Sequence, residues 1–172
     1  MEQLTPGAVF KVAQTTIQAA DYSFLITFNP AGYASSRLMQ HFAPETDLTI
    51  WFGASRVSRK VREIQYNSQA TVSFLPATEP AYATLVGTAQ LETDLALRQH
   101  YWRDDWIAFF PAGAQGDDYI LIKFVPTRIE VINFTQEVAT DPYGLKPATL
   151  IWNGTAWDFE PGNDEFAHRQ AA

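Results

Sequence analysis

Cationic and hydroxyl side chains crowd into residues 55–64, which read SRVSRKVREI. Valine and isoleucine recur within this stretch at helical spacing, which predicts a short helix that begins near Ser58. The N-terminus of a helix presents unpaired backbone N–H groups and the positive end of the helix dipole, so it can bind an anion. Positive side chains there oppose the dipole unless an anion compensates them. We therefore predict that Ser58, Arg59 and Lys60 bind a phosphate group.

An ordinary solvated helix is the alternative explanation of the same residues. Glu63 lies within reach of Arg59 or Lys60 for an intrahelical ion pair. Ligand binding is favoured by a second feature, Arg37, which falls in the predicted strand ASSRLM (34–39) among small and apolar residues. An arginine in such a strand can also be an edge residue that faces water.

No other group of side chains has the spacing of a catalytic or metal site. His41, His100 and His168 are far apart and lack the HExxH pattern. The acidic pairs at 104–105 and 117–118 are typical of solvated loops and helix ends. The chain has no cysteine, which excludes thiolate chemistry and disulfides and makes a reducing cytoplasm the simplest setting.

The net charge argues against two classes of partner. The 172 residues carry a formal charge of -7, and the sequence pI is about 4.8. General binding to nucleic acid or to an anionic membrane is therefore not expected, and any anion must be held locally. No apolar run approaches a membrane span, so we predict a cytoplasmic protein.

Strands dominate the expected secondary structure. They are predicted at 22–28, 33–42, 48–53, 70–75 and 81–92, followed by a closing hairpin of 118–126 and 128–134 across Pro126-Thr127. Helices are predicted at 6–21, from about 58 to 64, and at 94–102. Because regular βαβ alternation is missing, the pattern predicts a mainly β fold with an antiparallel, barrel-like sheet.

The end of the chain carries weaker signals. Residues 149–160 (TLIWNGTAWDFE) predict a small hairpin about Asn153-Gly154. The final residues, 161–172, are expected to fray or to form a strap on a partner subunit. We predict one domain, with a barrel at 1–134 and a C-terminal extension at 135–172.

The order of these segments resembles a known family. SSRLM, TIWFGASRVSRKVREI, SQATVSFL and YATLVGTAQLETD are similar to the FMN-binding split barrel of the pyridoxamine 5'-phosphate oxidase-like superfamily, and within it to the general stress protein 26-like group. The resemblance covers about residues 5–134. It implies an antiparallel split β-barrel, FMN as cofactor, and a homodimer with flavin sites at the interface.

The resemblance also implies which residues hold FMN. One strand would run beside the flavin ring and the ribityl phosphate, a second would end along the flavin, and the helix start would bind the phosphate. Two aromatic residues of YWRDDWIAFFP would be flavin neighbours, whereas core or dimer packing explains most aromatic residues of that segment. The predicted cofactor-binding residues are Arg37, Leu38, Met39, Trp51, Phe52, Ser58, Arg59, Lys60, Trp106 and Phe110.

The expected activity is that of an FMN-dependent oxidoreductase that uses a reduced nicotinamide nucleotide and a small acceptor. The alternatives are a flavin-binding or storage protein of the stress response without turnover, and a split barrel that uses F420 or heme. Vitamin B6 oxidation is not expected, because the ending EFAHRQAA does not match the arginine-bearing C-terminal segment of the true oxidases. The sequence identifies no catalytic side chain.

Overall fold

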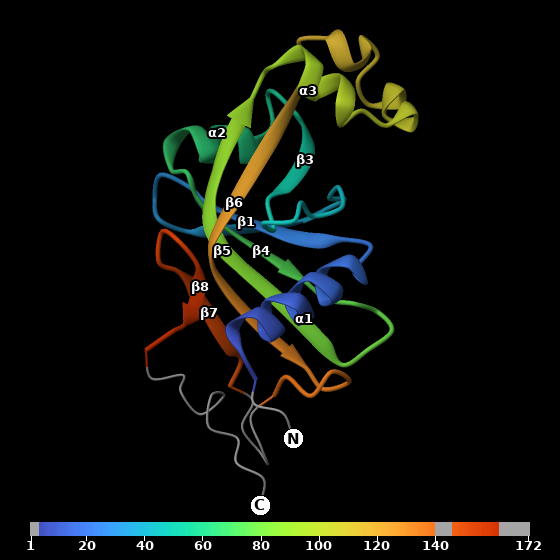
Figure 1. The fold of residues 1–172 in the computed structure, drawn as a ribbon. Helices are drawn as coiled ribbons and strands as arrows, with labels where there is room; N and C mark the ends of the chain where they lie inside the picture. The colour runs from blue at the N-terminus through green and yellow to red at the C-terminus, as the bar shows by residue number, and fades with distance from the viewer. Residues whose placement is uncertain (1–3, 140–145, 162–172) are drawn as a thin grey trace, which may run out of the picture. The chain divides into compact units, whose positions relative to one another are not determined.

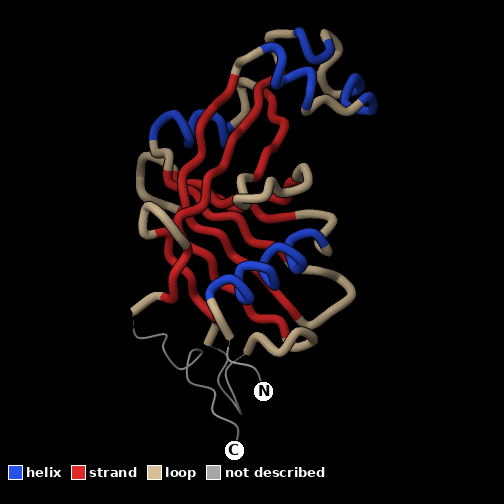
Figure 2. Tube along the Cα trace, viewed as in Figure 1, coloured by secondary structure: helices blue, strands red, loops and turns tan. Residues whose placement is uncertain are grey.

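Strands are the predominant regular secondary structure of the described residues, and helices are few (Figures 1 and 2). The structure is a computed structural model, and it describes residues 4–139 and 146–161. The helices are α1 (Pro6–Gln18), α2 (Arg59–Tyr66) and α3 (Leu95–His100), with 3-10 helices η1 (Asp104–Ala108) and η2 (Gly113–Gln115). The strands are β1 (Ser23–Phe28), β2 (Ala34–Met39), β3 (Ile50–Ser55), β4 (Gln69–Phe74), β5 (Ala81–Glu92), β6 (Tyr119–Asn133), β7 (Ala148–Trp152) and β8 (Trp157–Phe159).

The strands form one sheet of eight, which is open. The order is β2-β1-β4-β5-β6-β7-β8, and β3 pairs with β6 outside this path. The pairings of β6 with β3 and β7, and of β7 with β8, are antiparallel. Within residues 4–139 and 146–161 no strand pairing closes the path. The predicted mainly β fold, an antiparallel split barrel with a few short helices, is confirmed.

The chain divides into two compact units. Unit 1 contains the described residues of Met1–Ser23, Val72–Val86 and Pro126–Ala172, and unit 2 contains Phe24–Thr71 and Gly87–Val125. Strands β4, β5 and β6 contribute residues to both units. The division of one domain at residue 134 stays a prediction, and the predicted fraying or strap at 162–172 lies outside the described residues.

Unit 1 is built around α1. Thr5 caps this helix by accepting a hydrogen bond from the backbone N–H of Ala8 at 3.2 Å, as the Thr-Pro start predicts. Val9, Ala13 and Ile17 lie on the buried face of the helix. The ring of Phe10 lies 6.0 Å from that of Trp157 in β8. The hydrophobic stripe of α1 therefore faces the β7–β8 hairpin, which forms about Asn153-Gly154 as predicted.

A buried amide ties α1 to the end of β6 in the same unit. Asn133 donates from Nδ2 to Thr16 Oγ1 at 3.0 Å and to Glu79 Oε2 at 3.3 Å, and its Oδ1 accepts from the backbone N–H of Gln136 at 2.9 Å. Asn133 and Thr16 are fully buried. Buried polar groups are tolerated when they are hydrogen-bonded, and this amide is. We call Asn133, Thr16, Glu79 and Gln136 the Asn133 network.

The predicted hairpin across Pro126-Thr127 is wrong, because β6 runs unbroken from Tyr119 to Asn133. Antiparallel pairing with β3 extends to Phe124, and pairing with β7 starts at Arg128. Residues 125–127 pair with neither strand. A proline in that gap removes no hydrogen bond to β3 or β7, so it does not have to mark a turn.

Unit 2 holds the segments singled out in the sequence. In β3, residues point alternately to opposite faces of the sheet. Trp51 and Gly53 share one face with Tyr119 and Leu121 of β6, whereas Phe52 lies on the other. No helix of the described residues is long and apolar enough to cross a membrane.

Candidate functional site

The start of α2 carries the predicted phosphate-binding residues. Strand β3 ends at Ser55, a turn closes with the Ser58 N–H donating to the Ser55 carbonyl at 3.0 Å, and the helix begins at Arg59. Ser58 is the N-cap residue, but its side chain makes no capping hydrogen bond. Within the described residues its buried Oγ has no partner. The hydrogen-bonding capacity of this enclosed hydroxyl is therefore not used by the described residues.

A buried ion pair connects β2 with α2. Arg37 donates from Nη2 to Glu63 Oε2 at 2.7 Å, and the two side chains are 16% and 4% exposed. Arg37 Nη1 also donates to the Leu25 carbonyl at 3.1 Å and to Thr27 Oγ1 at 2.6 Å. Residues 35, 37 and 39 of β2 share one face by strand alternation, which directs Ser35 and Arg37 to the same side.

Glu63 is the hub of this network. It accepts hydrogen bonds from Thr27 Oγ1, from Ser35 Oγ at 2.9 Å and from Arg37. Burial by itself would raise the pKa of Glu63, but these hydrogen bonds and the charge of Arg37 outweigh it, so the pKa lies below its ordinary value. The carboxylate is therefore ionised at neutral pH and its acceptor capacity is used by the protein.

The surroundings of Lys60 disfavour its charged form, whereas those of Glu63 favour its charged form. Burial, followed by the nearby charges of Arg37 and Arg59, lowers the pKa of Lys60. No ion pair to Lys60 is found among the described residues, whereas Arg59 lies 3.6 Å from Glu63, Nε to Oε1, and is 68% exposed. We call Arg37, Arg59, Lys60 and Glu63 the cationic cluster. Its three cations outnumber its one anion by two, so it can hold a dianion.

A pocket opens beside the cationic cluster. It has a volume of about 310 Å³ and is lined by Asn29, Pro30, Ser35, Arg59, Arg62 and Glu63. The lining residues come from the β1–β2 turn, from β2 and from one face of α2. We call it the α2 pocket. Arg59 and Glu63 belong both to the pocket and to the cluster.

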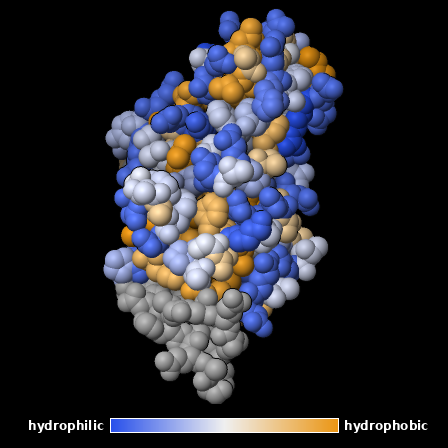
Figure 3. All heavy atoms as spheres, in the orientation of Figure 1, coloured by the Kyte–Doolittle hydropathy of each residue, from blue (hydrophilic) through white to orange (hydrophobic). Residues whose placement is uncertain are grey.

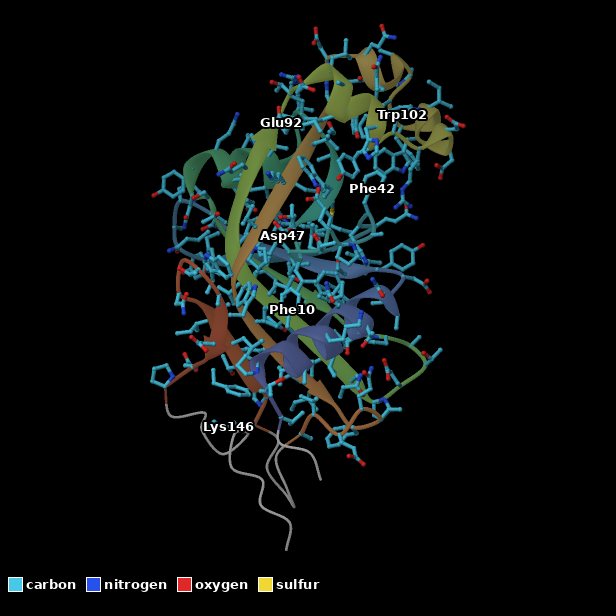
Figure 4. All side chains as sticks on the ribbon, viewed as in Figure 1. Phe10, Phe42, Asp47, Glu92, Trp102 and Lys146 are labelled. Carbon is cyan, nitrogen blue, oxygen red and sulfur yellow. The ribbon has the colours of Figure 1, made fainter. Side chains whose placement is uncertain are left out.

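A second group of predicted residues lies in an aromatic cluster of unit 2, between β3, β6 and the segment that follows α3. Trp51 is stacked on Tyr101, with ring centroids 4.8 Å apart and planes at 22°. Both donate to Glu45 Oε1, from Trp51 Nε1 at 2.6 Å and from the Tyr101 hydroxyl at 2.9 Å. Burial and the carboxylate of Glu45 raise the pKa of Tyr101 to about 12. Figure 4 labels Phe42 and Trp102, which also pack against this group.

Trp106 completes this aromatic cluster. A Cβ atom on Gly53 would come within 2.1 Å of Trp106 Cζ3, so the indole rests directly on the backbone of β3. Only 8% of Trp106 is exposed, and the Phe110 ring lies 6.3 Å away. We define the aromatic cluster as Trp51, Tyr101, Trp106, Phe110 and Tyr119. Its side chains pack mainly against one another.

The structure brings together some predicted site residues and separates others. Arg37, Arg59 and Lys60 meet at the start of α2, next to Ser58. Three others, Trp51, Trp106 and Phe110, meet in the aromatic cluster. The remaining three join neither group: Leu38 is 57% exposed, Met39 is buried, and Phe52 is fully buried on the face opposite to Trp51.

Sequence reasoning missed the part that Glu63 plays. It was expected only as an intrahelical partner of Arg59 or Lys60, yet its shortest contact with a basic residue is to Arg37. The helical pattern did not indicate it, because Glu63 lies well away from Val61 and Ile64 around the helix axis. Thr27 gives a weak signal, since alternation places it on the buried face of β1.

The open antiparallel sheet and the basic residues at the start of α2 are the features of a split β-barrel with an anion site. The chain matches the family described as pyridoxamine 5'-phosphate oxidase like over residues 9–140. It belongs to that family. The predicted resemblance is thereby confirmed. No protein with a curated description matches the chain.

Solved structures show the same fold. A protein of Clostridium acetobutylicum related to general stress protein 26 is 18% identical, with a TM-score of 0.69 over 86% of this chain and 96% of that one. An FMN-binding protein of Nostoc punctiforme, related to pyridoxamine 5'-phosphate oxidase, is 15% identical, with a TM-score of 0.64 over 93% and 98%. An F420 reductase is 18% identical, with a TM-score of 0.54 over 67% and 94%.

Proposed function

We propose that this chain binds FMN through the start of α2 and acts as an FMN-dependent oxidoreductase with a reduced nicotinamide nucleotide and a small acceptor. The observation that carries the proposal is Lys60, a half-buried cation beside two arginines with no ion-pair partner among the described residues. Such an arrangement is unfavourable for the protein alone and favourable once an anion is present.

The phosphate of FMN fits this site by charge and by hydrogen bonding. A phosphate monoester carries a charge of about -1.5 to -2 at pH 7, which matches the excess of two cations in the cationic cluster. The buried Ser58 Oγ adds a hydroxyl donor, and the first N–H groups of α2 add backbone donors. Because the whole chain is acidic, with a net charge of -7, this attraction is local.

The remaining predicted residues are proposed to contact the flavin ring. Adjacent residues of a strand face opposite ways, so Trp51 and Phe52 cannot both present side chains to one ring. Exposed Leu38 can offer an apolar contact, and the backbone of β2 and β3 can offer donors to the ring carbonyls. Bound FMN would supply the hydride acceptance, while the residues of the chain bind it and orient it.

We also propose a homodimer with flavin sites at the interface. Large apolar side chains are exposed in unit 2, among them Leu38, Val57, Ile107 and Phe109. Figure 3 shows such hydrophobic residues among hydrophilic ones on the face that it draws. Burying apolar surface of this kind against a second copy is favourable.

Two other candidates have specific support. An F420 reductase shares the fold, which favours F420 as an alternative cofactor. A flavin-binding protein without turnover is supported by the state of Glu63, the carboxylate of the cationic cluster. It accepts hydrogen bonds from Thr27, Ser35 and Arg37 and its pKa is lowered, so it is not available as a proton donor.

The test is a titration of the protein with FMN in which binding is measured by absorbance and by calorimetry. Arg59→Ala combined with Lys60→Ala should weaken FMN binding by about 1.5 to 3 kcal/mol for each hydrogen bond to the phosphate that the variant removes. Riboflavin has no phosphate, so its affinity should stay unchanged. Lys11→Ala, which removes one exposed cation from α1, is the control for loss of positive charge elsewhere on the chain. Equal affinity of FMN for the double variant and the wild type would rule out this phosphate site.

Turnover is tested on the FMN-loaded protein without oxygen. Loss of the flavin absorbance on addition of NADH or NADPH would support an oxidoreductase. Tight FMN binding with no such loss for either nucleotide would favour the flavin-binding alternative. Binding of F420 but not FMN would favour the deazaflavin alternative.

A further inference from the structure

The α2 pocket shares Arg59 with the phosphate site and adds one further cation, Arg62. Arg59 and Arg62 are three residues apart on α2, so they lie on neighbouring positions of one helix face. Both line the pocket, and both are exposed at its mouth. Within the described part of the chain, Arg62 has no ion-pair partner. The only acid that lines the pocket is Glu63.

Glu63 does not cancel this charge. Its two oxygens already accept from Thr27, Ser35 and Arg37, and Arg37 neutralises it at 2.7 Å. The charge that the pocket offers to a ligand therefore comes from Arg59 and Arg62. Two guanidinium groups suit a phosphate group, since each can donate two parallel hydrogen bonds.

The lining residues from the β1–β2 turn suit a base rather than a second phosphate. Asn29 fixes the β1–β2 turn, because its Oδ1 accepts from the N–H groups of Ala31 and Tyr33, both at 3.0 Å. That leaves Nδ2 of Asn29 without a hydrogen bond among the described residues. Pro30 adds an apolar surface beside it. A rigid amide donor next to an apolar ring can hold a heteroaromatic base.

The volume limits how much of a ligand the pocket can take. Sites for small molecules usually measure about 300 to 1,000 Å³, and this pocket, at about 310 Å³, is at the lower end of that range. It is large enough for one nucleotide unit and too small for a whole dinucleotide. The rest of the ligand must lie outside it.

We propose that the α2 pocket binds the adenosine monophosphate group of a dinucleotide, with its phosphate on Arg59 and Arg62 and its base against Asn29 and Pro30. The proposal rests on the proposed function, because Arg59 is shared with the phosphate site. The same group can come from two sources. FAD carries it beyond the flavin phosphate, and a nicotinamide dinucleotide carries it as a separate ligand.

Calorimetry on the full chain separates the sources. FAD and FMN are titrated into the flavin-free protein, and AMP is titrated into the FMN-loaded protein, each for the wild type and for Arg62→Ala. Removing a charge-assisted hydrogen bond should weaken binding about tenfold, while FMN affinity should stay within about twofold. A loss of affinity confined to FAD assigns the group to FAD, and a loss of affinity for AMP assigns it to the nicotinamide dinucleotide.

Matched variants keep the result specific. Arg62→Lys should recover part of the affinity because the charge is restored, Arg62→Glu should weaken binding further, and Lys11→Ala should have no effect. Because Arg62 is exposed, none of its variants should disturb folding, which circular dichroism verifies. If neither FAD nor AMP binding depends on Arg62, the proposal is overturned.

Failure of the proposed function gives a different pattern. If the wild type binds no FMN, the FMN site is wrong, and AMP is then titrated into the flavin-free protein. Binding of AMP that is weakened by Arg62→Ala still supports the pocket. Binding that Arg62→Ala leaves unchanged, or no binding, overturns the pocket as well.

Discussion

Two polar networks, one in each unit, are centred on a buried side chain, Asn133 or Glu63, and differ in how completely their groups are satisfied. In the Asn133 network every polar atom of the Asn133 side chain has a partner, and the charge of the amide is zero. In the cationic cluster the carboxylate of Glu63 is satisfied, but Lys60 has no anionic partner among the described residues and the adjoining Ser58 Oγ has none of any kind.

The difference separates a network that holds the fold together from one that can receive a ligand. A fully bonded amide has no free donor or acceptor for a ligand, so it contributes only to the stability of the tertiary structure. A cluster with surplus donors and charge is unfavourable by itself, and an anion relieves that condition. Variants of the two networks should therefore change stability and binding in different proportions.

The largest effect is expected for Glu63→Ala. Removing one member of a buried ion pair typically lowers the free energy of unfolding by about 3 to 5 kcal/mol, since Arg37 is left buried without its carboxylate. Thr27 and Ser35 lose their acceptor in the same variant. Urea denaturation measures the change.

The double variant Glu63→Leu with Arg37→Met is the control for Glu63→Ala. It removes both charges, so most of the stability should return. The affinity of the double variant for FMN should be lower than that of the wild type, because Arg37 is removed. A destabilisation below about 1 kcal/mol in Glu63→Ala would contradict a central role for this ion pair.

A smaller effect is expected for Asn133→Ala. The free energy of unfolding should fall by about 1 to 3 kcal/mol, because buried Thr16 loses its bond to the amide. FMN affinity should be unchanged, as measured by the same titration. An Asn133→Ala variant that folds normally but loses FMN would break the distinction between the two networks.

The smallest effect, and the one with the opposite sign, is expected for Lys60→Met. The folded state lowers the pKa of Lys60, so its protonated form is held less favourably there than in the unfolded chain. Replacing it should raise the free energy of unfolding of the flavin-free protein by about 0.5 to 1 kcal/mol and reduce the stabilisation by FMN.

The pH dependence of this difference is the control. The penalty is complete below the folded pKa of Lys60 and disappears as the pH rises toward the ordinary lysine pKa of 10.5. Thermal unfolding of wild type and Lys60→Met should therefore converge at alkaline pH. A variant less stable than the wild type at pH 7 would show that Lys60 contributes to the fold instead.

Local patterns in the sequence predicted most of the fold. Alternation, capping at Thr5 and the Asn-Gly turn depend on neighbouring residues, and each prediction was confirmed. The continuous strand through Pro126 was not predicted. A proline fits there because the pairing with β3 ends before it and the pairing with β7 begins after it. Strand partners far apart in sequence leave no local pattern.

The candidate site was predictable in part for the same reason. The pair of basic residues at 59–60 is a local pattern, and the structure places them together with Arg37. The contact of Arg37 with Glu63 joins residues 26 positions apart and depends on how β2 faces α2. The α2 pocket also requires the β1–β2 turn to meet the helix, which spacing alone does not reveal.

The small cationic cluster in an acidic chain has a consequence for the speed of binding. An anionic ligand is repelled by the net charge of -7 at long range and attracted by Lys60 and its arginines only at close approach. Salt screens the long-range repulsion over about 8 to 10 Å near physiological strength. Moderate salt should thus quicken association and, by weakening the final contacts, also quicken release.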